Sequence, residues 1–403
     1  TVVLCTATQP LLGELGLQNF PEDKRGTITA HGLLRLPENA EIMGKHQDLD
    51  KLFADLSRVE IRFNEKSGGW HVEEAGTFLL EQFQTTPSCL FIVNTKKWAQ
   101  ELYQYCQKKN VPPEALFHLS THQCAAHRKA IFDTIKARLE NKEPVICIST
   151  QLIEAGVDIS MACVIRALGG LDSIAQAAGR CNRHKEVDKG LVYVLNLQET
   201  DFSQILPDIA VGKEKAATIF REFEEKYILQ PKAMSRYFEL YFYNRSDEMV
   251  YLINEKDKND GLLHWLSDNC FNAGAKFKGY FKNDILRKRD LYPLLMQSFK
   301  SAGRIFQVID APTRSVIVPY GKGKEYITTL CGAWDAKEMS EAKKKAQYYS
   351  VNVFPKVWNK LQEKKALHET IKGSGIYYLD ECHYNNEFGL SLDKISEMTC
   401  YIS

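Results

Sequence analysis

The chain has 403 residues, 44% of them hydrophobic and 26% charged, a composition typical of an ordinary water-soluble protein with about two to three domains. Its 52 lysines and arginines nearly balance its 51 aspartates and glutamates, which excludes a protein that holds a polyanion by net charge alone. Eleven cysteines without a Cys-x-x-Cys pair, no signal peptide and no apolar run long enough to span a bilayer predict a cytoplasmic protein with reduced thiols and no membrane partner.

The pattern of elements begins with a buried-strand run at Thr1–Thr8, so we assign residues 1–20 to the end of a preceding lobe. Residues 21–57 have weak periodicity and predict a connector. Between residues 58 and 200, apolar strands alternate with amphipathic helices, which predicts a parallel sheet covered on both faces. The expected strands are Val59–Phe63, Cys89–Val93, Leu116–Leu119, Val145–Ser149, Cys163–Ala167 and Leu191–Leu195. The expected helices are Gly76–Gln84, Lys97–Lys108, Ala125–Asn141 and Ser173–Asn182.

From residue 201 the pattern changes, and residues 201–297 read as a helical linker. Its apolar residues recur at helical spacing and continue into an aromatic-rich stretch at 237–243: Ala216, Ile219, Phe220, Phe223 and Tyr227. In residues 298–403 shorter strands return around a Lys-rich helix, which predicts a small α+β domain. Its expected elements are the strands Arg304–Ile309, Ser315–Pro319 and Tyr348–Phe354 and the helix Lys337–Gln347. The predicted fold class is therefore α/β, a sheet lobe followed by a helical linker and an α+β domain.

Two segments of the sheet lobe contain the residues that could bind phosphate or take part in catalysis. In the first, the apolar run Val145–Ile148 leads into Ser149 and Thr150, and then into Gly156 and Asp158. Hydroxyls and free N–H groups at a strand-to-helix turn bind phosphate oxygens well. Helix capping and a tight turn would explain Thr150 and Gly156 singly.

The second segment runs from Gln176 to His184. If residues 174–183 are helical, Gln176, Arg180 and Arg183 share one face of one helix. Two permanent cations beside an amide suit the phosphoryl-transfer transition state, in which charge spreads over the transferred group. A solvated charged face is the alternative, but it would not require Gly179 in mid-helix at a cost of roughly 1 kcal/mol.

Together these segments resemble motifs V and VI of superfamily 2 helicases, and Thr6-Ala7-Thr8 resembles motif III of the same family, in the family order. Asn94 and Thr95 follow a strand and resemble motif IV, although a plain turn before the helix containing Trp98 is an alternative. The sequences Glu-Ala-Gly-Val-Asp and Gly-Arg-Cys-Asn-Arg-His within the two segments resemble those of the CRISPR-associated helicase-nuclease family of type I systems. The resemblance identifies residues 58–200 as a second RecA-like lobe.

The resemblance implies two sets of roles. The residues implied to contact single-stranded DNA are Ser149, Thr150, Asn94 and Thr95, and Thr6 and Thr8 are implied to couple DNA grip to nucleotide state. On the nucleotide side, Arg180 and Arg183 would act as arginine fingers on the γ-phosphate of ATP, and Gln176 would contact that phosphate or the attacking water. Gly156 would let the chain approach the nucleotide closely, and Asp158 would face the ribose or the two arginines.

The implied enzyme is an ATP-dependent DNA helicase with nuclease activity, recruited by the large subunit of an RNA-guided CRISPR surveillance complex. No Gly-x-x-x-x-Gly-Lys-Ser/Thr occurs in the sequence, and Asp380-Glu381 mimics a Walker B box in the wrong place. We therefore expect the Mg²⁺ ligands on a missing first lobe and the nuclease metals on a missing domain, so that this chain is a segment of a longer protein. The alternatives are another superfamily 2 DNA or RNA helicase, or an inactive half-protein that binds or regulates.

Overall fold

The computed structural model describes residues 57–154, 156–199, 206–243, 245, 251, 253, 262–266, 297–307, 312–332 and 335–394. Thr6, Thr8 and residues 21–56 of the connector lie outside the described residues. Contacts within the chain separate two units. One unit comprises residues 1–49 and 235–310, and the other comprises residues 50–234 and 311–403, so that the sheet lobe and the C-terminal domain belong to the same unit.

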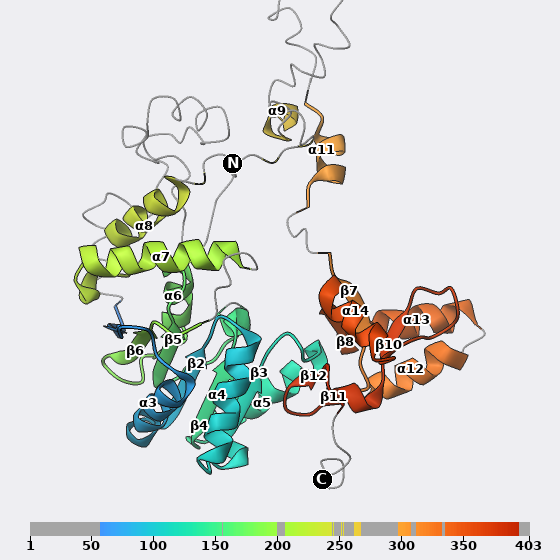
Figure 1. Ribbon diagram of the computed structural model, residues 1–403, viewed down its shortest axis with the longest axis horizontal. Helices are drawn as coiled ribbons and strands as arrows, with labels where there is room; N and C mark the ends of the chain where they lie inside the picture. Colours follow the sequence, from blue (N-terminus) through green and yellow to red (C-terminus); the bar gives the residue numbers. More distant parts are fainter. Residues whose placement is uncertain are drawn as a thin grey trace, which may run out of the picture. The chain divides into compact units, whose positions relative to one another are not determined.

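A six-stranded, entirely parallel sheet forms the lobe, in the order β1-β6-β5-β2-β4-β3 (Figure 1). Its strands are β1 (Val59–Asn64), β2 (Ser88–Ile92), β3 (Leu116–Leu119), β4 (Val145–Ser149), β5 (Cys163–Ala167) and β6 (Gly190–Leu195). Every residue of β2, β4 and β5 is buried, as expected for strands covered on both faces. The predicted strands are confirmed, three of them with the same bounds, and the RecA-like α/β fold is confirmed with them.

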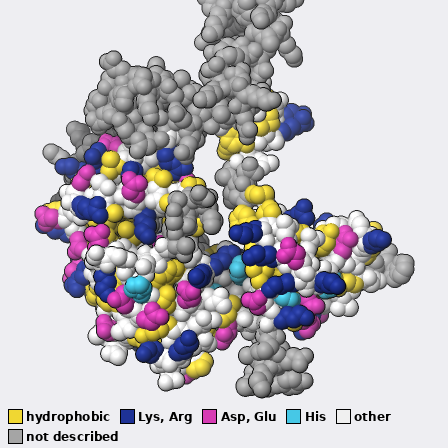
Figure 2. Space-filling model, viewed as in Figure 1, with side chains coloured by type: hydrophobic (Ala, Val, Ile, Leu, Met, Phe, Trp, Pro, Cys, Tyr) yellow, Lys and Arg dark blue, Asp and Glu magenta, His cyan; other side chains and the backbone are white. Residues whose placement is uncertain are grey.

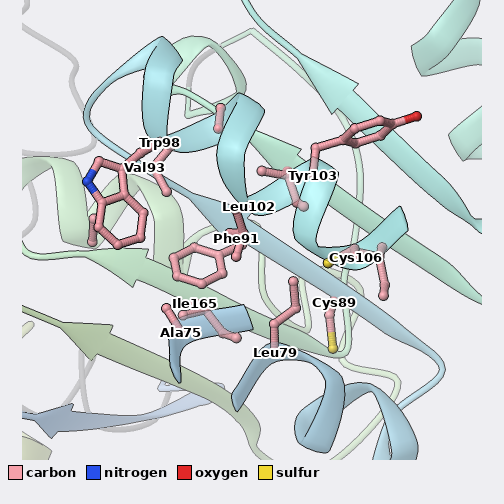
Figure 3. Packing of buried hydrophobic residues seen from close by; sticks show 14 of the residues in the cluster. Ala75, Leu79, Cys89, Phe91, Val93, Trp98, Leu102, Tyr103, Cys106 and Ile165 are labelled. Carbon is pink, nitrogen blue, oxygen red and sulfur yellow. The ribbon is translucent and has the colours of Figure 1, made fainter. Parts of the chain in front are cut away.

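Four helices cover the two faces of this sheet. Right-handed crossovers place α3 (Val72–Thr85) and α4 (Lys96–Lys108) on one face and α5 (Ala125–Glu140) and α6 (Leu171–Ala178) on the other. On the first face, side chains of α3 and α4 pack on alternate residues of the strands (Figure 3). Leu79, Phe91, Leu102 and Ile165 are completely buried there. Because strand side chains alternate between the faces, Arg166 lies on the face covered by α5 and α6.

Beyond the lobe, helical structure follows as predicted, in α7 (Pro207–Glu222) and α8 (Pro231–Tyr243), joined by the short 3₁₀ turn η4 (Glu225–Tyr227). The aromatic stretch is helical: the rings of Phe238 and Phe242, one turn apart, stack at 6.0 Å. Two short helices are described in the other unit, α9 (Leu262–Leu266) and α11 (Phe299–Ile305). The prediction of a strand at Arg304–Ile309 is wrong, because Arg304 and Ile305 form the last turn of α11.

The C-terminal domain contains a four-stranded mixed sheet in the order β8-β7-β10-β9. Its strands are β7 (Arg314–Ile317), β8 (Ser350–Val353), β9 (Leu367–Glu369) and β10 (Tyr377–Leu379). Its helices are α12 (Gly323–Gly332), α13 (Ala336–Ala346) and α14 (Pro355–Glu363), with the 3₁₀ turns η7 (Gln347–Tyr349) and η8 (Glu381–His383). The predicted α+β pattern is confirmed here. None of the described helices is both long and apolar enough to cross a membrane.

A short hairpin joins the C-terminal domain to the lobe. Its strands are β11 (Tyr384–Asn385) and β12 (Gly389–Leu390), and it lies against the region of β3 and α5 (Figure 1). The Tyr384 hydroxyl lies 2.9 Å from Nδ1 of His127, and the backbone N–H of Leu390 donates to the His122 carbonyl at 2.9 Å. The ring of Phe388 packs edge-on against Tyr103 and His118. The hairpin therefore docks the domain by specific hydrogen bonds and aromatic contacts.

Candidate nucleic-acid and nucleotide site

Two predicted DNA-contact segments meet at the carboxyl edge of the sheet, where open α/β sheets bind their ligands. Asn94 and Thr95 follow β2, Thr150 follows β4, and these strands are neighbours. The carbonyl of Ser149 accepts from the N–H of Val93 at 2.9 Å, which aligns the two strand ends. Thr150 is 8% exposed and starts the 3₁₀ turn η3 (Gln151–Ile153), but its hydroxyl makes no capping hydrogen bond. Capping therefore does not explain this threonine.

Beside Thr150, the N-terminus of α4 adds a hydroxyl and a cation. Thr95 caps α4, with its hydroxyl oxygen accepting from the N–H of Trp98 at 3.3 Å, and its contact with DNA stays a prediction. Lys96 follows as the first helical residue, and burial lowers its pKa to about 8. Burial, together with the nearby charge of Lys96, lowers the pKa of His122 to about 3. Lys96 was not singled out from the sequence, although it adjoins the motif IV residues.

The remaining two predicted DNA contacts have buried side chains. Ser149 is completely buried, and its hydroxyl donates to the carbonyl of Thr150 at 2.9 Å. Asn94 is 4% exposed, and its amide nitrogen donates to the Leu168 carbonyl while its amide oxygen accepts from Arg166. Both side chains are therefore buried and hydrogen-bonded within the protein, and the contact with DNA expected at these two positions stays a prediction.

From Thr150 the chain crosses the sheet from its carboxyl edge to its amino edge without an α-helix. The turn η3 is the helical element described between β4 and β5. Gly156 has a φ of +73°, a conformation that side chains disfavour, and a Cβ there would meet no atom within 4 Å. The glycine is thus explained by the turn that redirects the chain toward Asp158.

Helix α6 ends earlier than predicted, and this changes the placement of the two arginines. It stops at Ala178, so Gln176 lies in its last turn, half-buried, while Arg180 and Arg183 follow the helix. The expected single helix face is therefore wrong: Gly179 ends the helix instead of lying within it. Instead, Met161 and Cys181 form a bridge beside the amino end of β5, which fixes the chain that carries both arginines.

Arg180 is 8% exposed and points along the motif V segment. Its guanidinium donates to the backbone carbonyls of Glu154, at 2.6 Å, and Val157. Its Nε is buried and has no acceptor among the described residues. Burial, together with the neighbouring Arg183, lowers its pKa. Arg180 therefore braces the motif V segment and keeps one N–H without a partner.

Arg183 is the accessible arginine of the pair. Its Nε lies 2.7 Å from Oδ1 of Asp158, and the side chains are 37% and 70% exposed, respectively. Its backbone N–H donates to the Ser160 hydroxyl at 3.0 Å, which anchors this position to the end of the motif V segment. The structure thus brings Asp158 and Arg183 together, the second of the two arrangements expected for Asp158.

A buried polar cluster that was not predicted lies between these two regions. Arg166 of β5 is 1% exposed and pairs with Glu154, with 2.8 Å between Nε and Oε1. The Ser173 hydroxyl donates to Glu154 at 2.6 Å and accepts from Arg166 at 2.9 Å. The sequence did carry one signal, a charged residue inside the apolar strand Cys163–Ala167.

The Walker B mimic is structural, as expected. Asp380 follows β10 and caps the turn η8, with its carboxylate accepting from the N–H of Cys382 at 3.0 Å. His383 is 1% exposed, and its Nδ1 lies 3.0 Å from the carbonyl of Ser391. Within the described ranges, no three His, Cys, Asp or Glu side chains gather as a metal site.

Comparison with known proteins finds sequence matches within the sheet lobe. Residues 85–186 match the family described as CRISPR-associated nuclease/helicase Cas3, C-terminal. A segment of 60 residues is 52% identical to the CRISPR-associated nuclease/helicase Cas3 of Haloferax volcanii, which covers 14% of this chain and 6% of that protein. The resemblance predicted from the motifs is confirmed by these matches.

Solved structures extend the likeness of fold over most of the chain. T. fusca Cas3 superposes with a TM-score of 0.52 at 14% identity, covering 80% of this chain and 39% of that one. The structure of T. fusca Cas3-ADP gives a TM-score of 0.50 at 14% identity, covering 80% and 40%. The chain thus spans about two fifths of the length of the solved structures that it matches. In fold, it is similar to the C-terminal part of a Cas3 helicase.

Proposed function

We propose that this chain, similar over residues 85–186 to the C-terminal region of Cas3, is the second motor lobe and C-terminal domain of an ATP-dependent single-stranded DNA translocase. The complete protein would degrade foreign DNA in type I CRISPR interference. Residues 1–20 would then end the first lobe, 21–57 would connect the lobes, 58–200 would form the second lobe, 201–297 the linker and 298–403 the accessory domain. The eight cysteines within the described residues are unpaired, which fits a cytoplasmic protein.

The observation that carries the proposal is the placement of two surfaces at opposite ends of one sheet. Thr150, Thr95 and Lys96 at the carboxyl edge offer hydroxyls and a cation to a phosphate backbone. Beyond the amino edge, Arg183 offers an accessible guanidinium. Basic and acidic side chains are interspersed over the face that Figure 2 shows, so local contacts and not a single-sign face would hold the strand there.

The surface that carries Arg183 would contact one side of a bound ATP, and the first lobe would contact the other side. Arg183 would bind a phosphate oxygen, while Arg180 would hold the motif V segment in place beside it. Gln176 would orient the attacking water, and Thr6 and Thr8 would couple the lobes. When bound, Mg²⁺ neutralises phosphate charge; its ligands and the nuclease metals would lie on the first lobe and nuclease domain.

The test uses the complete protein with both lobes and the nuclease. We expect ATP hydrolysis stimulated by single-stranded DNA, and degradation of a target plasmid only when an RNA-guided surveillance complex is present. Stimulation by RNA in place of DNA would favour a different superfamily 2 helicase. No turnover by the complete protein would favour a binding or regulatory role.

A second experiment uses the 403-residue chain alone. Because its sequence contains no Gly-x-x-x-x-Gly-Lys-Ser/Thr segment to hold the triphosphate, we expect no ATP turnover above background, with or without DNA. Turnover by this chain alone would contradict the two-lobe argument and would return attention to Asp380 and Glu381. Heat-treated chain provides the background measurement.

A further inference from the structure

The buried cluster around Arg166 is unusual because it places a permanent charge inside the lobe. Arg166 is the fourth of the five residues of β5 and lies on the face covered by α6. Its guanidinium contacts three side chains at 2.7 to 2.9 Å, those of Asn94, Ser173 and Glu154. An apolar residue would fill this strand position without any need for partners. Packing alone therefore does not account for the arginine.

Glu154 connects this cluster to the motif VI segment. Its carboxylate pairs with Arg166 and accepts from the Ser173 hydroxyl, while its backbone carbonyl accepts from a guanidinium nitrogen of Arg180 at 2.6 Å. One residue thus contacts two arginines, one from β5 and one from the segment after α6. A shift of its side chain would move the carbonyl that holds Arg180.

At its other end the cluster reaches the carboxyl edge of the sheet. Nη1 of Arg166 donates to the amide oxygen of Asn94 at 2.7 Å. Asn94 lies two residues after the end of β2, and the neighbouring strand β4 ends just before Thr150. Glu199 accepts from the amide nitrogen of Asn94 at 3.2 Å and from Lys213 of α7 at 3.0 Å. A strand of five residues separates the two edges by about 16 Å.

We propose that Glu154, Arg166 and Ser173 form a positioning network that transmits DNA contact at Thr150 to the arginines Arg180 and Arg183. This inference rests on the proposed function and adds residues that neither predicted surface contains. From Asn94 to Arg180 the network is continuous, and each link is a hydrogen bond or ion pair between buried or partly buried groups. A displacement of the strand ends by bound DNA therefore has a direct path to the segment that presents Arg183.

The decisive variants separate positioning from stability, and all are made in the complete protein. Glu154→Gln keeps the shape but removes the charge, so it leaves Arg166 buried without its ionic partner and lowers the melting temperature. The double variant Glu154→Leu with Arg166→Met removes both charges and should restore the melting temperature, because a buried pair can be replaced by apolar groups at little cost. Ser173→Ala is the mild variant and keeps the ion pair.

The readout is the ratio of ATP turnover with and without single-stranded DNA, beside the melting temperature and the KM for ATP. We expect this ratio to fall about tenfold in both Glu154→Gln and the double variant, and about threefold in Ser173→Ala, with KM unchanged. Asp133→Asn, which neutralises an exposed ion pair on α5, is the matched control and should keep the wild-type ratio.

Recovery of the wild-type ratio by the double variant, together with its melting temperature, would show a structural role only and overturn the positioning network. A wild-type ratio in folded Ser173→Ala and Glu154→Gln would overturn it as well. Failure of single-stranded DNA to stimulate ATP turnover by the complete wild-type protein is a different result. It would refute the proposed function and remove the basis of this inference with it.

Discussion

Nε of Arg183 lies 2.7 Å from a carboxylate oxygen of Asp158, and both side chains remain open to solvent. An exposed pair of this kind contributes little to stability, at most about 1 kcal/mol. Its geometry instead holds an otherwise flexible guanidinium in one direction, which would preorganise it for the phosphate contact that we propose.

In the complete protein, Arg183→Ala should lower ATP turnover by about 10³-fold or more, because an arginine finger acts mainly in the transition state. The KM for ATP and DNA recruitment should change much less. Arg183→Lys should not restore turnover, since an ammonium lacks the planar fork that spans two phosphate oxygens. Steady-state ATPase and plasmid-degradation assays measure the effect. Near-normal processive degradation by Arg183→Ala would refute the assignment.

Thr150→Ala should weaken single-stranded DNA binding by about fivefold, because it removes one phosphate contact of roughly 1 kcal/mol. Unstimulated ATP hydrolysis should stay close to wild type. Thr134→Ala is the control, since that hydroxyl lies exposed on α5 and bonds only to a carbonyl of its own helix. Fluorescence anisotropy with a labelled oligonucleotide gives the affinities. Unchanged affinity with lost turnover would move Thr150 to the nucleotide side.

Gly389→Ala should loosen the docking hairpin. Gly389 has a φ of +79°, and a Cβ there would lie 2.3 Å from the carbonyl oxygen of His122, so both strain and a backbone clash oppose the substitution. We expect a loss of about 2 kcal/mol or more. Gly373→Ala is the matched control, because its φ of +84° carries the strain while its surroundings are open. Thermal unfolding measures both; equal losses would mean that the clash is absorbed.

Docking of the hairpin should also depend on pH. Burial lowers the pKa of His118 and of His127 to about 4, against about 6.5 in an unfolded chain. The unfolded state then binds more protons between these values, so stability is complete above pH 6.5 and is lost as the pH falls toward 4. Denaturant unfolding at several pH values should show this slope. His127→Gln should reduce the slope of stability against pH by the equivalent of about one bound proton. An unchanged slope would exclude His127 as a source of the pH dependence.

Much of the lobe could be predicted because its strands are unbroken apolar runs. Leu116–Leu119 and Cys163–Ala167 have the predicted bounds, since burial on both faces leaves few alternatives for such segments. The strand expected at Arg304–Ile309 failed because a short apolar run fits strand and helix equally, and long-range packing decides between them. The end of α6 was missed because Gly179 was read as an interior residue.

At the candidate site, the sequence located the right segments but not the direction of each side chain. Motif spacing could not reveal that Arg180 turns inward to the carbonyl of Glu154 while Arg183 stays at the surface. That difference depends on the end of α6 at Ala178 and on the turn at Gly156, which has a positive φ. The Arg166 network joins residues of four segments, and no local periodicity encodes such a partnership.

The hairpin contact between His127 and Tyr384 has a consequence for how the chain assembles. These residues are 257 positions apart, so their hydrogen bond closes a very long loop that includes α7, α8 and residues 235–310 of the other unit. The entropy of closing such a loop grows only with the logarithm of its length, and halving or doubling it changes the cost by about 0.6 kcal/mol. Related proteins can therefore lengthen or shorten the intervening segment freely, while the docked surfaces at both of its ends must coevolve.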